Sequence, residues 1–266
     1  MVAEVLLTNV STVASRPAPV PLFNLRPTTM RHSIQTILAA AVLLFARSAY
    51  AEKPNAFIFT PSQGTGPFPV ALWLHGYRGY SPDGYFPGAT SAALQKHADK
   101  LGAVIIGFPG TTDLGDGTQQ WSEEPVADHA YIQARLNAIS KTNRIDLTRV
   151  GLFGFSQGAM VSADLATLYP QSYCGAILMS PGGMGPPKVA ETKLPAHSKQ
   201  VFYCFCGAQE HPRNVGLTKA YATHLDKVLG AHVTLKLYEG VSKHARPADF
   251  MEQFPDWMGA ILKQHE

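Results

Sequence analysis

The chain has 266 residues, of which 45% are apolar and 15% charged, and its formal net charge is +3. This is ample for one large α/β domain with its own core. The first 51 residues hold four of the 22 basic and one of the 19 acidic residues, so the remainder carries 18 of each. The positive charge therefore belongs to the N-terminal segment and gives no indication of nucleic-acid binding.

That N-terminal segment has the pattern of a secretory leader. Met30-Arg31-His32 opens a short basic region, residues 37–46 are an apolar run of ten, and Ala49-Tyr50-Ala51 is a small-residue cleavage site. The run is too short to span a bilayer, which takes roughly 20 residues. We therefore expect a signal peptide at about 30–51, cleavage after Ala51, a secreted or periplasmic protein with no stable membrane span, and a folded domain at 52–266. A buried core helix is the alternative for the apolar run, and residues 1–29 are either an over-extended gene start or part of an unusually long leader.

From residue 55 onward, apolar runs of strand length alternate with segments of helical spacing. Strands are expected at 55–60, 70–74, 103–108, 150–155, 175–180, 201–206 and 233–237, and helices at 90–101, 127–139, 156–169, 216–229 and 248–262. This alternation predicts an α/β fold with a mainly parallel sheet and helices on both faces. In such sheets, functional residues gather at the carboxyl ends of the strands.

The strand at 70–74 runs into His75-Gly76-Tyr77-Arg78. We expect the His75 side chain to hold this loop, and the backbone N–H of Tyr77 to be available as a donor to a charged substrate oxygen. The loop 109–124 follows the next strand and contains Trp121. Gly76, Arg78 and Trp121 are the residues we expect to contact a substrate, together with Tyr80, Tyr85 and the 181–187 loop, although aromatic residues usually belong to the core.

The strand at 150–155 ends in Gly154-Phe155-Ser156-Gln157-Gly158, a G-x-S-x-G pattern. A serine lifted out of a strand onto a tight turn needs neighbours without Cβ atoms, because the strand and helix backbones pass close by. The Gln157 N–H then lies near the start of the next helix, where partial positive charge gathers. An isolated match also fits a plain glycine-rich turn, but the strand before it and the helix after it favour a nucleophile.

Two later strand ends supply the partners that a serine nucleophile requires. Serine needs a base within hydrogen-bond reach, and that base needs an orienting acid. Glu210 follows the strand at 201–206, and His244 lies in a glycine-containing loop after the last strand. The chain order is nucleophile, acid, histidine, as on α/β-hydrolase scaffolds. Glu239 and Asp249 are the alternative acids.

The three cysteines are Cys174, Cys204 and Cys206. An odd count in an exported protein leaves one unpaired. Cys204 and Cys206 would lie on one face of one strand, which is a poor geometry for a mutual bond. A bond from Cys174 to one of them, or three buried free thiols, are the alternatives.

Together these motifs resemble those of α/β-hydrolase serine esterases, in particular extracellular feruloyl esterases and polyhydroxybutyrate depolymerase-like proteins, with kinship to the phospholipase/carboxylesterase group. The resemblance is carried by LHG at 74–76, Trp121, Asp128, IDLTRV at 145–150, GFSQGA at 154–159, Tyr169-Pro170, GAQE at 207–210 and EGVSKH at 239–244. It implies Ser156 as nucleophile, His244 as base, and the N–H groups of Tyr77 and Gln157 as oxyanion-hole donors. The family usually has Asp where this chain has Glu210, and a small residue where it has Lys243. No long insertion follows the 175–180 strand, so we expect a minimal lid.

The resulting hypothesis is an exported serine esterase that acts through an acyl-enzyme intermediate on small-molecule or polymer esters with short-chain or aryl groups, without a metal or an organic cofactor. A peptidase or amidase with the same triad is not distinguished from it by sequence. A catalytically silent binding protein on a hydrolase scaffold is the alternative from another class, and its only support is Glu210 and Lys243.

Overall fold

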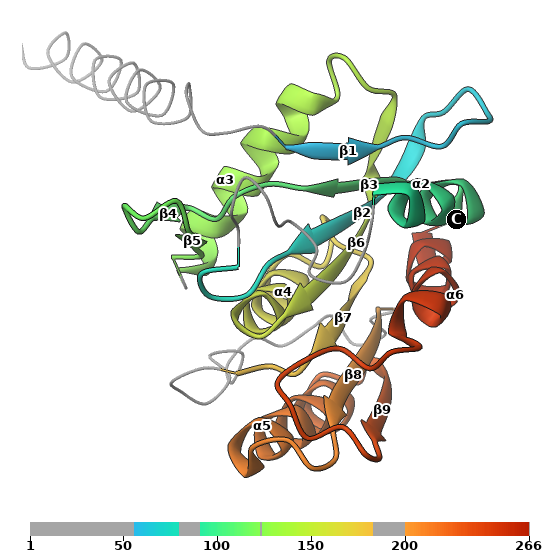
Figure 1. Cartoon of the computed structure of the whole chain (residues 1–266). Coiled ribbons are helices and arrows are strands. Elements are labelled where there is room, and N and C mark those ends of the chain that lie inside the picture. Colours follow the sequence, from blue (N-terminus) through green and yellow to red (C-terminus); the bar gives the residue numbers. More distant parts are fainter. Residues whose placement is uncertain (1–55, 80–90, 123, 183–199, 266) are drawn as a thin grey trace, which may run out of the picture. The chain divides into compact units, whose positions relative to one another are not determined.

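The computed structural model describes residues 56–79, 91–122, 124–182 and 200–265 (Figure 1). The expected leader at 1–51 and the domain boundary at 52 lie outside these ranges. So do Tyr80, Tyr85 and all but the first two residues of the 181–187 loop.

Within the described residues, the strands form a seven-stranded sheet in the order β1-β3-β2-β6-β7-β8-β9. The strands are β1 (Phe57–Phe59), β2 (Phe68–Leu74), β3 (Val104–Gly107), β6 (Ile145–Phe155), β7 (Gly175–Met179), β8 (Val201–Gly207) and β9 (His232–Tyr238). All neighbours run parallel except β1, which pairs antiparallel with β3 at one edge. The central strands are buried on both faces, which explains their near-continuous apolar sequences.

Helices cover both faces of this sheet, as the alternation of elements predicts. Helices α3 (Pro125–Ile139), α4 (Gln157–Leu168) and α5 (Pro212–Thr223) lie on one face, and α2 (Ser91–Leu101) and α6 (Phe250–Leu262) lie on the other (Figure 1). Side chains alternate across each strand, so every second residue faces each helical layer. On the α2/α6 face, Trp73, Phe153 and Phe205 pack with Phe250 and Phe254 in one apolar cluster.

Three elements differ from the expected ones by more than two residues. The loop at 109–124 contains a small hairpin of β4 (Thr112–Asp113) and β5 (Gln119–Gln120), whose turn has glycines at 115 and 117 with positive φ. The serine strand begins five residues earlier than expected, at Ile145, because β6 extends along Phe68 past an irregularity in the register. The helix expected at 216–229 begins at Pro212 and ends in the π-helical turn η2 (His224–Val228).

The cysteines form no disulfide: Cys174, Cys204 and Cys206 are all buried free thiols. The neighbouring strands β7 and β8 pair Gly175 with Val201 and Leu178 with Cys204. Cys174 therefore lies about four residues along the sheet from Cys204, and a strand rises about 3.3 Å per residue. That separation is beyond the reach of a disulfide.

Candidate active site

Ser156 stands on a sharp turn between β6 and α4. Its backbone has φ +56° and ψ −117°, which places a residue other than glycine in a sparsely populated region. The Ser156 N–H donates to the Met179 carbonyl at 3.0 Å, and the Ser156 carbonyl accepts from Ala159 N–H at 3.1 Å. These bonds to the next strand and the following helix hold the strained turn in place.

The glycines on either side of Ser156 have the steric role that the motif predicts. A Cβ atom on Gly154 would lie 2.1 Å from the Gly158 carbonyl oxygen, and one on Gly158 would lie 2.2 Å from the Leu74 carbonyl oxygen. Gly76 also approaches the serine, since a Cβ there would make a tight contact of 3.2 Å with Ser156 Cβ. The ends of β2 and β6 are therefore packed directly against the start of α4, and this brings the Gly76-Tyr77 loop beside the serine.

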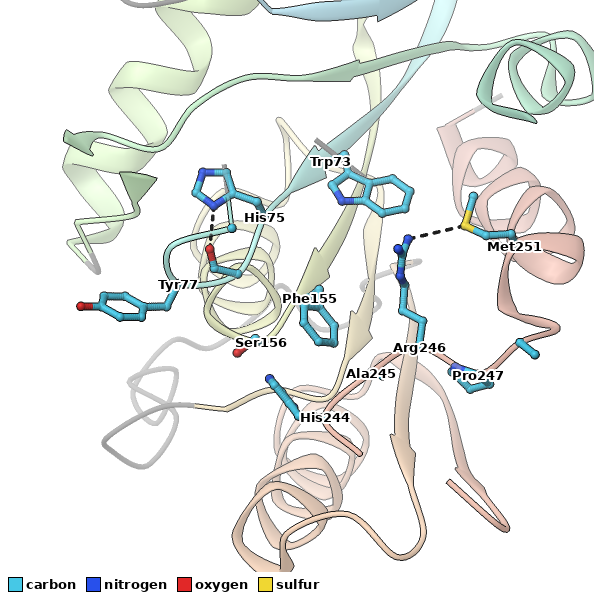
Figure 2. A pocket seen from close by; sticks show the side chains of 13 residues that line it. Trp73, His75, Tyr77, Phe155, Ser156, His244, Ala245, Arg246, Pro247 and Met251 are labelled. Atoms are coloured by element: carbon cyan, nitrogen blue, oxygen red, sulfur yellow. Dashed lines mark hydrogen bonds between the residues drawn. The ribbon is translucent and has the colours of Figure 1, made fainter. Parts of the chain in front are cut away.

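His244 and Glu210 come together from the ends of neighbouring strands. The Nδ1 atom of His244 lies 2.5 Å from Glu210 Oε1. In Figure 2 the other ring nitrogen of His244 points toward the Ser156 hydroxyl. Ser156 Oγ and His244 Cε1 border the same space, because a Cβ on Gly182 would lie 3.5 Å from the first and 3.6 Å from the second. The three residues are thus arranged in the order acid, imidazole, hydroxyl.

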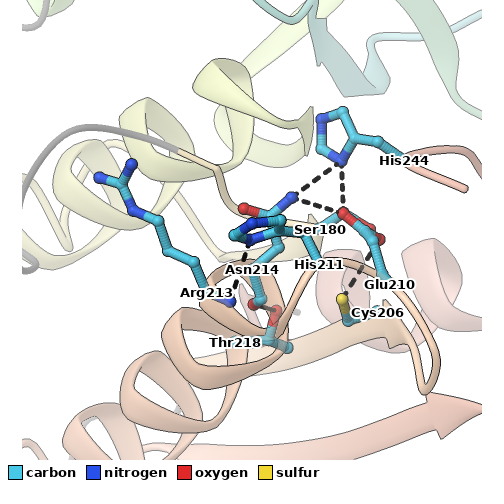
Figure 3. A network of polar contacts seen from close by, with 8 residues as sticks. All are labelled: Ser180, Cys206, Glu210, His211, Arg213, Asn214, Thr218 and His244. Atoms are coloured by element: carbon cyan, nitrogen blue, oxygen red, sulfur yellow. Dashed lines mark hydrogen bonds and ion pairs between the residues drawn. The ribbon is translucent and has the colours of Figure 1, made fainter. Parts of the chain in front are cut away.

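Three further side chains hold the Glu210 carboxylate, whose exposed fraction is only 1% (Figure 3). Asn214 Nδ2 donates to Oε1 at 2.6 Å, and on the other side the Ser180 hydroxyl and the Cys206 thiol donate to Oε2 at 2.9 and 3.3 Å. Burial opposes ionisation of Glu210, but the hydrogen bonds, led by Asn214 and His244, outweigh it and lower the pKa of the carboxyl. Burial raises the pKa of Cys206 to about 11, so the thiol keeps its proton and donates it.

The alternative acids lie away from the imidazole. Glu239 accepts a hydrogen bond of 2.9 Å from Gln209 and is exposed. Asp249 accepts from Gln253 at the start of α6. Of the carboxylates that the structure describes, Glu210 is the one that contacts His244.

His75 holds its loop, as expected, and is buried beneath the serine turn. Its Nδ1–H donates to the Gly76 carbonyl at 2.7 Å, and its Nε2 accepts from Gly110 N–H at 2.9 Å. Burial lowers the pKa of His75 to about 4, although the bond to Gly76 acts in the opposite direction. A neutral imidazole is what the acceptor role of Nε2 requires.

Trp121 does not reach the site, contrary to the expectation from sequence. The β4–β5 hairpin carries it inward, where its side chain is 1% exposed and its Nε1–H donates to the His75 carbonyl at 3.0 Å. It thus supports the loop at His75 and Gly76 and does not line the cavity beside Ser156. Arg78 also turns away: it is exposed, has φ +55°, and pairs with Asp116.

The predicted oxyanion donors sit on either side of the serine. Gln157 is the first residue of α4, and its side chain bonds the Trp121 backbone at 3.2 and 3.3 Å. Tyr77 lines the cavity beside Ser156, and its side chain is 55% exposed. Their backbone N–H groups stay the predicted donors to the oxygen of a carbonyl group attacked by Ser156.

A cavity of about 570 Å³ opens beside Ser156 (Figure 2). Gly76 and Tyr77 line it as expected, but several other lining residues were not predicted from the sequence, among them Trp73, Phe155, Arg246 and Met251. The sequence signal for Arg246 was its position two residues after His244. Within the described ranges, no group of three or more His, Cys, Asp or Glu side chains is placed to hold a metal ion, and no helix is long and apolar enough to cross a membrane.

The sequence and the fold were compared with protein families and with solved structures. The model of a family described as phospholipase/carboxylesterase matches residues 118–261. The fold is similar to that of a carboxylesterase from Bacillus cereus, with 17% identity, a TM-score of 0.55, and 82% of this chain and 98% of that chain covered. It is also similar to esterase PE8, with 19% identity, a TM-score of 0.61, and 79% and 100% covered.

A further structural neighbour is Est1E from Butyrivibrio proteoclasticus, solved with ferulic acid, at 14% identity and a TM-score of 0.51, with 79% of this chain and 94% of that chain covered. At these identities the likeness is one of fold. No curated protein matches the sequence.

Proposed function

Because the chain belongs to the phospholipase/carboxylesterase family of α/β-hydrolases, we propose that it hydrolyses carboxylic esters with Ser156, His244 and Glu210 as its triad. The observation that carries this proposal is the 2.5 Å contact between His244 Nδ1 and Glu210 Oε1, made by a ring whose other nitrogen points toward Ser156 (Figure 2). A serine hydroxyl is a weak nucleophile, and this arrangement supplies the base and the acid that orients it.

In the proposed reaction, His244 Nε2 takes the hydroxyl proton as Ser156 Oγ attacks the ester carbonyl carbon. Glu210 accepts the Nδ1–H and stabilises the imidazolium that forms. The N–H groups of Tyr77 and Gln157 stabilise the negative oxygen of the tetrahedral intermediate. His244 then returns the proton to the leaving alcohol, and the same steps with water in place of Ser156 release the acid from the acyl-enzyme.

We propose short-chain or aryl esters, free or at the ends of a polymer, as the substrates. The cavity of about 570 Å³ lies in the range usual for small-molecule sites, and it is lined largely by apolar and aromatic groups. We further propose that the protein acts after export, with the leader at 1–51 removed and residues 52–266 as the catalytic domain. Cleavage after Ala51 is checked by sequencing the N-terminus of protein recovered from outside the cytoplasm.

The direct test combines labelling and turnover. A fluorophosphonate probe should label the full chain on Ser156, and p-nitrophenyl acetate and butyrate should be hydrolysed. Ser156→Ala should abolish both, whereas Ser172→Ala, at a half-buried serine in the turn after α4, should change neither. Folded protein that is neither labelled nor active would instead favour a binding protein on a hydrolase scaffold. Turnover of a matched anilide faster than the ester would favour an amidase.

A further inference from the structure

A positively charged side chain, Arg246, lines the cavity beside Ser156. Arg246 lies in the loop that carries His244. Figure 2 shows its guanidinium reaching away from His244, between Trp73 and Met251. The positive charge therefore borders the same cavity as Ser156.

The protein groups that the structure describes satisfy little of the hydrogen-bonding capacity of this guanidinium. A guanidinium has five N–H donors. One hydrogen bond runs from Arg246 Nη1 to Met251 Sδ at 3.7 Å, and a thioether is a weak acceptor. The Arg246 Cζ atom also lies 5.4 Å from the centre of the Trp73 ring, which is a cation–π contact. Within the described ranges, no carboxylate forms an ion pair with Arg246.

Such a charge is costly to leave without an anion. Burial lowers the pKa of the Arg246 guanidinium, but arginine starts so far above neutral pH that it remains charged. Partly buried cations in proteins are usually paired, because removing them from water costs free energy that only an opposite charge or good hydrogen bonds offset. Among the described residues that line the cavity, no carboxylate is placed to pair with Arg246, and the guanidinium belongs to the cavity wall.

We propose that Arg246 binds a carboxylate carried by the substrate, so that the enzyme prefers anionic esters to neutral esters of the same size. This inference rests on the proposed function, because it names the substrate class of the same site. A planar guanidinium can donate two parallel hydrogen bonds to the two oxygens of a carboxylate, in a bidentate pair. The apolar side chains of Trp73, Phe155 and Met251 line the cavity and suit the hydrocarbon chain that links the ester to the carboxylate.

The carboxylate takes no part in the bond changes. Water still cleaves the ester into an acid and an alcohol, and the proton passes through His244 as for a neutral ester. Binding at Arg246 fixes the distance between the anion and the ester carbonyl, which holds the carbonyl carbon near Ser156. Half-esters of dicarboxylic acids and aryl esters whose alcohol carries a carboxylate are the two substrate types that share this chemistry.

Two matched substrate pairs test the proposal and separate these types. The p-nitrophenyl half-ester of glutarate is compared with p-nitrophenyl pentanoate for an anion on the acyl side. For an anion on the alcohol side, 3-carboxyphenyl acetate is compared with 3-methylphenyl acetate. We expect the unmutated enzyme to have a higher kcat/KM for the anionic member of at least one pair.

Variants then assign the preference to Arg246. Arg246→Met keeps an unbranched side chain about as long as the apolar stem of arginine and removes the charge. It should lower kcat/KM for the preferred anionic ester about tenfold to a hundredfold and for its neutral match less than about threefold. Arg246→Lys keeps the charge but loses the planar fork, so it should retain part of the preference. Lys243→Met is the matched control, because Lys243 is an exposed cation of the same loop outside the cavity lining, and it should leave the preference unchanged.

The comparison of anionic and neutral esters is made on the unmutated enzyme, so its outcome does not depend on whether a variant folds. Equal or slower turnover of the anionic ester in both pairs overturns the inference, as does a folded Arg246→Met protein that keeps the preference or loses both activities equally. If neutral esters are hydrolysed through Ser156 without an anionic preference, the proposed function stands and this inference fails. If no ester of any kind is hydrolysed and Ser156 is not labelled, the proposed function itself fails.

Discussion

Asn214 Nδ2 lies 2.6 Å from Glu210 Oε1, the same oxygen that contacts His244. The helix α5 begins at Pro212, so the Asn214 side chain in its first turn reaches back to the acid that precedes the helix. The long glutamate side chain is thereby fixed at its tip, where its extra methylene would otherwise add freedom. The bond therefore holds in place a side chain that is one methylene longer than the aspartate expected from the sequence resemblance.

Replacing Asn214 should therefore impair catalysis through Glu210. We expect Asn214→Ala to lower kcat/KM about tenfold, because the carboxylate loses a strong hydrogen bond. The pKa of Glu210 should rise, since Asn214 is the leading hydrogen bond that lowers it, and the pH below which activity is lost through protonation of Glu210 should move upward. Ester hydrolysis measured from pH 4 to 9 shows both effects. Asn137→Ala, at an exposed position on α3, should leave the profile unchanged.

Substitutions of the acids should identify Glu210 as the triad member. Glu210→Gln keeps the shape and removes the charge, and we expect kcat to fall about 10³- to 10⁴-fold. Glu210→Asp keeps the charge but shortens the side chain, so it should retain more activity than Glu210→Gln. The matched variants Glu239→Gln and Asp249→Asn should stay near full activity. A loss of activity confined to one of these two would move the acid assignment to that residue.

The buried His75 should make the fold sensitive to acid. Its pKa is about 4 in the folded protein and about 6.5 in an exposed histidine, so the unfolded chain binds the proton first as pH falls. The contribution of neutral His75 to the free energy of unfolding is fully present above pH 6.5. It is lost as the pH falls toward 4, and the total loss is about 3 kcal/mol. Thermal melts between pH 7 and 4 should show a smaller loss of Tm in His75→Gln than in the unmutated protein. Equal slopes would show that His75 is not the group responsible.

Two glycine substitutions should have opposite effects on stability. Gly158→Ala would place a Cβ 2.2 Å from the Leu74 carbonyl oxygen, so the backbone at Leu74 and at Gly158 would have to move apart. We therefore expect the free energy of unfolding to fall by at least about 3 kcal/mol. Gly216 lies in α5 with nothing within 4 Å of its Cβ position. Gly216→Ala should therefore raise stability by about 0.5–1 kcal/mol. Urea denaturation of the two variants measures both values.

The sequence predicts which strand ends meet, because the carboxyl ends of parallel strands share one edge of the sheet. Ser156, Glu210 and His244 each follow a strand of this kind, and the structure brings them together. Side-chain direction within a loop depends on packing that no local pattern encodes. Trp121 directly follows the short β4–β5 hairpin and lies inward, where its Nε1–H donates to the His75 carbonyl. Arg246 lines the cavity, with its guanidinium in a cation–π contact with Trp73.

The backbone of Ser156 also limits which residue can serve as nucleophile there. At φ +56° a side chain branched at Cβ meets its own backbone, whereas an unbranched one does not. Threonine carries the same hydroxyl as serine, yet its additional methyl group makes it unsuited to this turn. Cysteine, unbranched and close in size, fits the same backbone. The backbone conformation of this turn thus restricts position 156 by side-chain shape. It disfavours threonine and accepts cysteine, so Ser156→Cys is the exchange of hydroxyl for thiol that the fold permits.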